Sequence, residues 1–257
     1  MNNMKRIIED LNAKKNNYCR IKHKQGWLDY LEDGDTVFTP QKLKDTIEKV
    51  INNNPPKGDK LFDLSKHHSF TMLSEKKPER TEEALERFIV ISNGDNFYNQ
   101  IPVGGGKESI DIGIEENKSK FIFIELKPWD SDNSPMYAII ESLKNLVEYQ
   151  TIIAKEIKDI EKFEERELMI LAPSDYYASY KLTNDKNLSV LKETLTKICE
   201  EFETPITFME LIIEKEFFLE ECRKIYKGPG KEFVNVSKQN AIDALARKRW
   251  KLLVSSK

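Results

Sequence analysis

Three charged residues, Asp111, Glu125 and Lys127, occur in two stretches of the chain that are otherwise strongly apolar. Asp111 lies within Ser-Ile-Asp-Ile-Gly-Ile, and the other two residues close the run Phe-Ile-Phe-Ile-Glu-Leu-Lys. Burying two carboxylates and an amine in a sheet costs free energy unless a cation joins them. Because Mg²⁺ prefers oxygen ligands and keeps several waters, one or two carboxylates are enough to bind it. The three residues therefore predict a divalent-metal site with a lysine beside it.

The chemistry that such a site favours is hydrolysis of a phosphodiester bond. A bound Mg²⁺ acidifies a water molecule and offsets the charge of the phosphate. Lys127, placed next to the ion, can orient the attacking water or stabilise the charge that develops in the transition state. Its two neighbouring carboxylates should keep it protonated, so we predict a positioning and electrostatic role rather than that of a base.

Two adjacent β-strands are expected to position these side chains. In the first strand, isoleucines alternate with Asp111 and Gly113, which places Asp111 on the opposite face from the isoleucines. The second, at about 120–127, is apolar on both faces, as is typical of a central strand. Glu125 and Lys127 are two residues apart and project from the same face of this strand. A turn at about 116–119 joins the strands.

A helix predicted from residue 81 to about residue 93 supplies a further carboxylate. Glu82 shares a face with Leu85 and Glu86 at helical spacing. A carboxylate on the apolar face of this helix, Glu82, is its notable feature. Glu82 and Glu83 are also explained by the preference of acidic residues for a helix N-terminus.

The remainder of the chain predicts an α/β protein. Residues 79–257 form the core: a long helix capped by Ser134-Pro135, a strand at 167–172, a helix at 189–202 and a strand at 206–213. This alternation favours parallel pairing in a layered sheet. A basic helix is predicted at about 238–254. Residues 1–78 are expected to form an N-terminal helical extension, with helices at about 4–15 and after Thr39-Pro40.

The order of helix with Glu, strand with Asp, strand with Glu-x-Lys and then a long helix resembles the PD-(D/E)xK nuclease superfamily. The matching residues are Ile110-Asp111-Ile112 and Ile124-Glu-Leu-Lys127, with Ile110 standing where the motif name has proline. The resemblance implies a restriction-endonuclease-like fold, with a central mixed β-sheet flanked by helices. It also implies Asp111 and Glu125 as metal ligands and Lys127 as the catalytic lysine. Some members use an outer ligand on the preceding helix, a role for which we choose Glu82 from its helical face, while Glu83 and Glu86 compete for it.

The expected cofactor is Mg²⁺, for which Mn²⁺ can substitute, and the expected substrate is nucleic acid, with DNA favoured over RNA. Some members of the superfamily carry a Gln-x-x-x-Tyr pattern on the next helix, to which Asn145-x-x-x-Tyr149 is similar. Cleavage of both strands of a duplex would favour a homodimer, because two sites must face two strands.

Composition limits the other classes of protein to which this chain can belong. The formal net charge is −3, so any contact with DNA must come from a local basic patch such as Arg247-Lys-Arg-Trp250. The absence of a run of about 18 apolar residues predicts no membrane span. Three widely spaced cysteines predict free thiols and a cytoplasmic location.

Three other functional hypotheses remain open from the sequence. The chain can be a catalytically inactive nucleic-acid-binding or interaction module that keeps the nuclease fold. It can be a different phosphodiester enzyme, such as an RNase or a repair nickase. It can also be a structural protein in which Glu125 and Lys127 are solvated charges at the end of a strand.

Overall fold

The computed structural model describes residues 3–11, 39–55, 81–103, 109–154, 163–226, 240 and 243–257. The end of the first predicted helix, at about 12–15, lies outside these residues, as does the start of the predicted C-terminal helix. The adjacent histidines His67 and His68, the glycine-rich stretch 104–107 and the basic stretch 227–231 also lie outside them.

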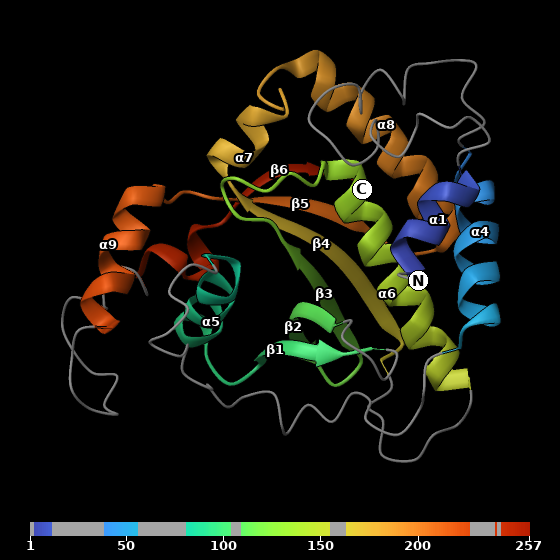
Figure 1. Cartoon of the computed structure of the whole chain (residues 1–257), viewed down its shortest axis with the longest axis horizontal. Helices are drawn as coiled ribbons and strands as arrows, with labels where there is room; N and C mark the ends of the chain where they lie inside the picture. The colour runs from blue at the N-terminus through green and yellow to red at the C-terminus, as the bar shows by residue number, and fades with distance from the viewer. Residues whose placement is uncertain are drawn as a thin grey trace.

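A six-stranded mixed sheet forms the centre of the protein, with its strands in the order β1-β2-β3-β4-β5-β6 (Figure 1). The strands are β1 (Phe97–Pro102), β2 (Ser109–Asn117), β3 (Lys120–Leu126), β4 (Glu165–Pro173), β5 (Ile206–Leu211) and β6 (Lys251–Ser255). The first three strands form an antiparallel meander. β3, β4 and β5 are parallel, and β6 is antiparallel to β5. The predicted α/β class and mixed sheet are confirmed.

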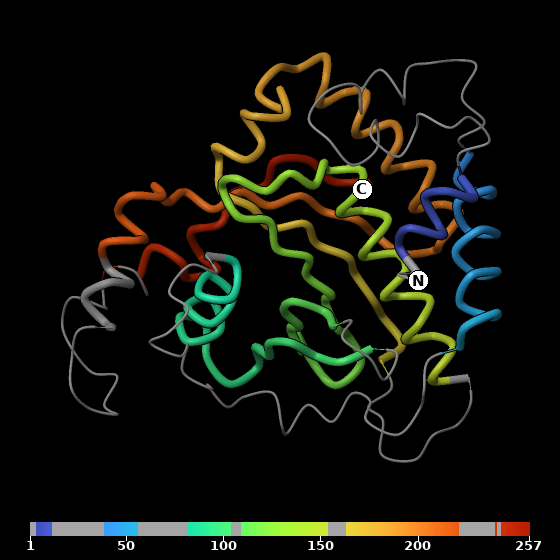
Figure 2. The backbone as a smooth tube through the Cα atoms, viewed as in Figure 1, coloured from blue at the N-terminus to red at the C-terminus, as the bar shows by residue number. Residues whose placement is uncertain are grey.

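Helices flank both faces of the sheet, as Figure 1 shows. They are α1 (Asn3–Leu11), α4 (Pro40–Asn53), α5 (Thr81–Asn93), α6 (Pro135–Ala154), α7 (Ser174–Ser179), α8 (Asp185–Phe202) and α9 (Lys215–Tyr226), with a 3₁₀ turn, η2, at Arg247–Arg249. α1 packs on α4 and α6, and α4 packs on α6 and α8, so these four helices lie together on one side of the molecule (Figure 2). Among the described helices, none has the length and apolar character needed to cross a membrane.

Local sequence signals explain where the helices begin. The Thr39 side chain accepts a hydrogen bond from the Lys42 amide at 3.2 Å, and Pro40 occupies the first turn of α4. Ser134 Oγ likewise accepts from the Tyr137 amide at 3.1 Å at the start of α6. Both predicted N-caps are therefore confirmed.

The sheet separates two apolar cores. One joins the sheet to α1, α4, α6, α7 and α8, and includes Ile7 and Ile47. The other joins it to α5 and α9, and includes Leu85 and Phe218. β3 is buried from Phe121 to its end, as expected of a central strand. The described helices of the predicted N-terminal extension thus belong to the same core as the sheet.

The predicted C-terminal helix is wrong over its final part. Residues 251–255 form β6, which pairs with β5, and Arg247–Arg249 form only a 3₁₀ turn. Residues 251–255 form a strand because their backbone groups pair with the edge of β5. Local helix propensity does not include this long-range contact. The sequence reasoning also missed α7 and α9.

Gly113 provides a test of the packing between β1, β2 and β3. A Cβ at this position would lie 2.3 Å from the Phe121 ring and 2.4 Å from Ile101 Cδ1, which is closer than real contacts allow. We expect Gly113→Ala to lower the free energy of unfolding by roughly 1–3 kcal/mol, as other overpacked cores do. Urea unfolding measures this change.

The control for this variant is Gly94→Asn. Gly94 has φ 93° and no atom within 4 Å of an added Cβ, and asparagine tolerates positive φ better than most residues. Equal stability of Gly113→Ala and the unmodified protein would contradict the packing described here.

Candidate functional site

The predicted charged residues lie at one end of the β2–β3 hairpin. Asp111 is near the start of β2, and Glu125 and Lys127 are at the end of β3, which runs antiparallel to β2. Asp111 Oδ2 accepts a hydrogen bond from the Leu126 amide at 2.9 Å, so its carboxylate lies against the backbone between Glu125 and Lys127. The Lys127 amide donates to Leu171 O at 3.0 Å, which ties the end of β3 to β4.

Lys127 is held between two carboxylates. Its Nζ donates a short hydrogen bond to Glu125 Oε1 and lies 3.2 Å from Glu141 Oε2. The Lys127 and Glu125 side chains are only 4% and 5% exposed, whereas Glu141 on α6 is 27% exposed. Burial alone would lower the pKa of Lys127, but the carboxylates of Glu125 and Glu141 raise it well above its ordinary value. Lys127 is therefore a cation at neutral pH.

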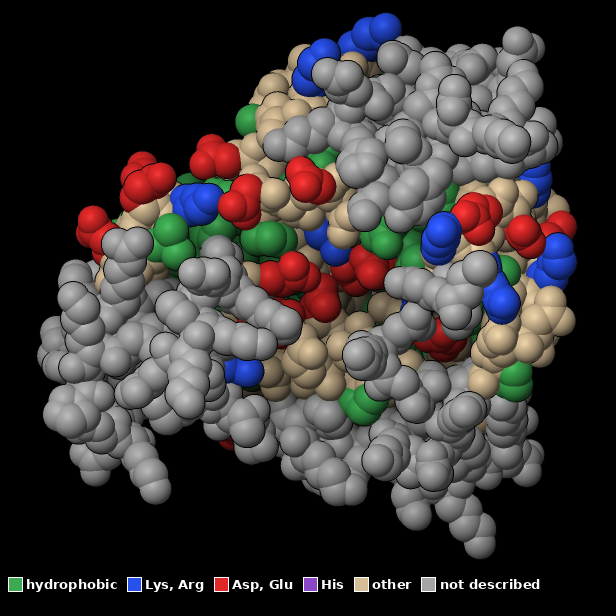
Figure 3. All heavy atoms as spheres, viewed as in Figure 1, with side chains coloured by type: hydrophobic (Ala, Val, Ile, Leu, Met, Phe, Trp, Pro, Cys, Tyr) green, Lys and Arg blue, Asp and Glu red, His purple; other side chains and the backbone are tan. Residues whose placement is uncertain are grey.

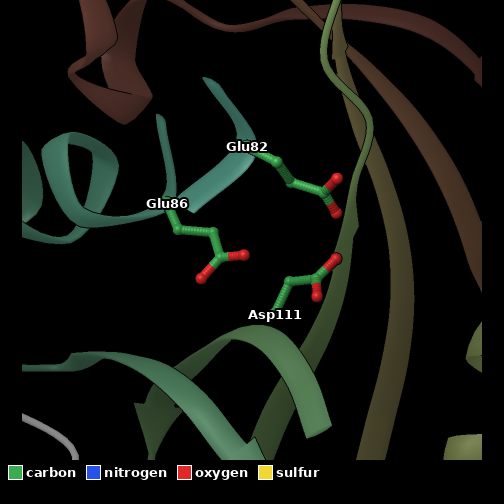
Figure 4. Close-up of side chains that lie close together, drawn as sticks. All are labelled: Glu82, Glu86 and Asp111. Atoms are coloured by element: carbon green, nitrogen blue, oxygen red, sulfur yellow. The ribbon is translucent and has the colours of Figure 1, made fainter. Parts of the chain in front are cut away.

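Helix α5 brings two carboxylates to Asp111. Glu82 and Glu86, one helical turn apart, each have an oxygen within 4.8 Å of the other and of an Asp111 oxygen. Figure 4 shows the three side chains pointing toward one another from α5 and β2. Gln100 Nε2 on β1 donates to Glu86 Oε2 at 2.6 Å. Of the competing glutamates on this helix, both Glu82 and Glu86 thus belong to the group, and Glu83 does not.

The carboxylates outnumber the cations at this site. Burial raises the pKa of Asp111 to about 7, although the charge of Lys127 and the Leu126 amide act in the opposite direction. Burial also raises the pKa of Glu86 and of Glu125 well above the usual value, and the charge of Asp111 adds to both shifts.

The pKa values of the other two carboxyls, Glu82 and Glu141, shift in opposite directions. Burial raises the pKa of Glu82. Burial opposes ionisation of Glu141 as well, but the charge of Lys127, hydrogen bonds with Glu125 and Lys127 and the charge of Lys144 together lower the pKa of that carboxyl. Acidic side chains gather in the hollowed centre of the face seen in Figure 3.

The side chains fit a hard divalent cation. The donors are carboxylate oxygens, which Mg²⁺ and Mn²⁺ prefer. Asp111 would be the central ligand, since it contacts Glu82 and Glu86 on one side and the end of β3 on the other. Glu125, expected as a ligand, also accepts a hydrogen bond from Lys127, and Glu86, one of the competing glutamates, lies with Glu82 and Asp111 in the oxygen-rich group.

The sequence reasoning missed Glu141 and Gln100. The only signal for Glu141 was its position as the first charged residue after the apolar run Met136–Ile140. Tyr149, considered as a site residue, packs edge-on against Phe123 with ring centroids 5.3 Å apart. Its hydroxyl accepts from the Phe163 amide at 2.9 Å, so Tyr149 belongs to the core.

Arg247, in the basic segment near the C-terminus, forms an ion pair away from the acidic group. An Arg247 guanidinium nitrogen lies 2.5 Å from Glu116, and Lys120 lies 3.2 Å from both Glu116 and Glu167. These ion pairs are at the turn of the β2–β3 hairpin, the opposite end from Asp111. Arg247 therefore pairs with Glu116 at this end of the sheet, and a contact of the basic patch with DNA stays a prediction.

Comparisons with protein-family models, with curated proteins and with solved structures found no match to this chain.

The raised pKa of Asp111 makes a prediction about stability. Its ordinary pKa is about 3.9, so between about pH 4 and pH 7 the folded protein binds more protons than the unfolded chain and loses stability as the pH rises. Asp111→Asn keeps an oxygen for the Leu126 amide but removes this titration. In EDTA we expect the variant to have the higher melting temperature at pH 8, with an advantage that narrows as the pH falls toward 4.

Thermal unfolding from pH 4 to pH 8 measures the difference. Glu193→Gln neutralises an exposed carboxylate on α8 and should leave the pH profile nearly unchanged. A melting temperature at pH 8 that is lower for Asp111→Asn than for the unmodified protein would contradict this prediction. It would mean that other groups of the folded protein already balance the negative charge of Asp111.

Proposed function

We propose that this protein is a divalent-metal-dependent nuclease of the PD-(D/E)xK type that hydrolyses phosphodiester bonds in DNA. One observation carries the proposal: five carboxyl groups, contributed by four elements, gather at one end of the β2–β3 hairpin, where four of them act on the buried Lys127. Such an excess of negative charge is costly without a cation, and a divalent ion would offset it.

The arrangement of elements supports a restriction-endonuclease-like fold. An acidic helix, α5, precedes a meander whose second and third strands carry Asp111 and the Glu125-Leu-Lys127 motif. α6 then crosses to β4, which is parallel to β3. This is the order that the resemblance implies.

Asp111, Glu82 and Glu86 would hold the ion on the side of α5, with Glu125 on the side of β3. When bound, a divalent cation lowers the pKa of a coordinated water and offsets the negative charge of the scissile phosphate. The Leu126 amide fixes the Asp111 carboxylate, so this group needs little reorganisation when it binds a ligand.

Lys127 would act as a fixed positive charge. Its partners Glu125 and Glu141 keep it protonated, so it donates hydrogen bonds rather than accepting a proton. In this role it orients the attacking water or stabilises the charge on the phosphate oxygens. Glu141 completes the pair of carboxylates that position the Lys127 ammonium group.

The geometry and the electrostatics support a functional site over a set of solvated charges. Clusters of carboxyls with raised pKa values beside a buried charged partner are found preferentially at functional sites. We also propose that the enzyme acts on DNA rather than RNA, and that cleavage of both strands requires a homodimer.

Cleavage assays test the function directly. With Mg²⁺ or Mn²⁺ we expect the protein to cut plasmid DNA and single-stranded DNA, and to cut RNA more slowly. Asp111→Asn and Lys127→Met should each reduce the rate at least about 100-fold, as expected when a group that stabilises transition-state charge is removed. Lys197→Met, which removes an exposed lysine of α8, is the matched control and should retain full activity.

Two results would overturn the nuclease proposal. One is the lack of cleavage of any nucleic acid under conditions in which the protein binds Mn²⁺. The other is equal cleavage by the unmodified protein and Lys127→Met, which would assign the activity to another site or to a contaminant.

Glu141 provides a further prediction. Glu141→Gln keeps the shape of the side chain but removes the charge that faces Lys127 at 3.2 Å. We expect kcat to fall roughly 10- to 100-fold, because the ammonium group is less well positioned, while KM changes little. Steady-state cleavage of a labelled oligonucleotide measures both constants, with Glu193→Gln as the control. An unchanged kcat would exclude a role for Glu141.

A further inference from the structure

Gln100 has an unusual backbone conformation for a residue inside a strand. Its φ is 51°, in the left-handed region, although it lies in β1 and carries a side chain. This conformation is unfavourable for a residue other than glycine. The two other described residues of this kind have ordinary explanations: Glu203 is the C-cap of α8, and Lys181 follows Tyr180, the C-cap of α7.

Gln100 lies directly across from Asp111. The pairs Asn99–Ile112 and Ile101–Ile110 are in register, whereas the pair between them, Gln100 and Asp111, is absent from the ladder. The sheet also changes its packing here. Ile112 belongs to the core beneath α5, but Ile101 and Ile110 belong to the core beneath α6. The predicted alternation of the isoleucines in β2 is therefore wrong at Ile110, because both strands turn at this pair.

The side chain of Gln100 connects the turn to the acidic group. Its Nε2 donates to Glu86 Oε2 at 2.6 Å, and its Oε1 accepts from Ser109 Oγ at 3.4 Å. The bond from Ser109 orients the amide so that its nitrogen faces α5. Glu86 itself is only 2% exposed, so the amide holds one oxygen of a buried carboxylate that lies beside Asp111.

We propose that Gln100 is a positioning residue for cation binding, which it serves by holding Glu86 in the orientation that faces Asp111 and Glu82. The inference rests on the proposed metal-dependent function of this site. The strained backbone of Gln100 is what places the amide between β2 and α5. Strained backbone conformations that strand pairing does not require often occur at functional sites.

Gln100→Gly separates this role from a purely structural one. Glycine adopts the left-handed conformation without strain, which offsets the loss of the hydrogen bond to the buried Glu86 carboxyl, so the free energy of unfolding in EDTA should change little. The amide is lost, so Mn²⁺ affinity should fall about 10- to 100-fold, as is typical when a partner of a metal ligand is removed. Isothermal titration with Mn²⁺ and urea unfolding give the two values.

Gln100→Met and Glu203→Gly complete the experiment. Gln100→Met keeps the approximate size of the side chain but removes the donor that faces Glu86 and adds no charge to the acidic group, so Mn²⁺ affinity should fall about as far. Glu203→Gly relieves the same backbone strain at the C-cap of α8, and should leave Mn²⁺ affinity unchanged.

The outcomes for the two proposals are distinct. Mn²⁺ affinity of Gln100→Gly equal to that of the unmodified protein overturns the role of Gln100, whatever the nuclease assay shows. If the unmodified protein binds Mn²⁺, Gln100→Gly binds it more weakly and no nucleic acid is cut, only the nuclease proposal fails. If the unmodified protein binds no Mn²⁺, both proposals fail.

Discussion

A buried lysine among carboxylates is the constraint on which the rest of the site depends. Lys127 contacts Glu125 and lies 3.2 Å from Glu141, and the negative charges of Asp111 and Glu82 act on it as well. One cation cannot balance five carboxyls. Burial is the largest cause that raises the pKa of Asp111, which reaches about 7 even beside Lys127. A protein gains no stability from such an arrangement. The excess charge instead makes the end of the sheet a place where an added cation would be stabilised strongly.

Four elements must meet for this charge to gather, and backbone geometry brings them together. The antiparallel pairing of β2 with β3 places Asp111 against the Leu126 amide. Helix α6 returns over the sheet and brings Glu141 to Lys127. β1 departs from regular geometry at Gln100, which aims an amide at Glu86 on α5. Gly113 allows the close approach of Ile101 and Phe121 in the same region, so packing and charge are coupled across the meander.

The parts of the fold that could be predicted were those that local rules determine. Alternating and continuous apolar runs indicated β2 and β3, and Thr39-Pro40 and Ser134-Pro135 marked the starts of α4 and α6. The C-terminal segment was misassigned because residues 251–255 become a strand only by pairing with β5, a contact that is distant along the chain. α7 was missed because it is only six residues long, and its Tyr176 and Tyr177 are buried by contacts with other elements.

By itself, the sequence determined the two strands of the hairpin, the placement of Glu125 and Lys127 on one face, and the presence of acidic residues on the helix before them. Those features depend on periodicity, which is a property of neighbouring residues. Only the tertiary structure decided that Glu82 and Glu86 both reach Asp111 and that Glu141 faces Lys127. It also decided that Gln100 contacts Glu86 and that Arg247 pairs with Glu116. Each of these contacts joins separate elements, and the packing of helices on the sheet sets its distance.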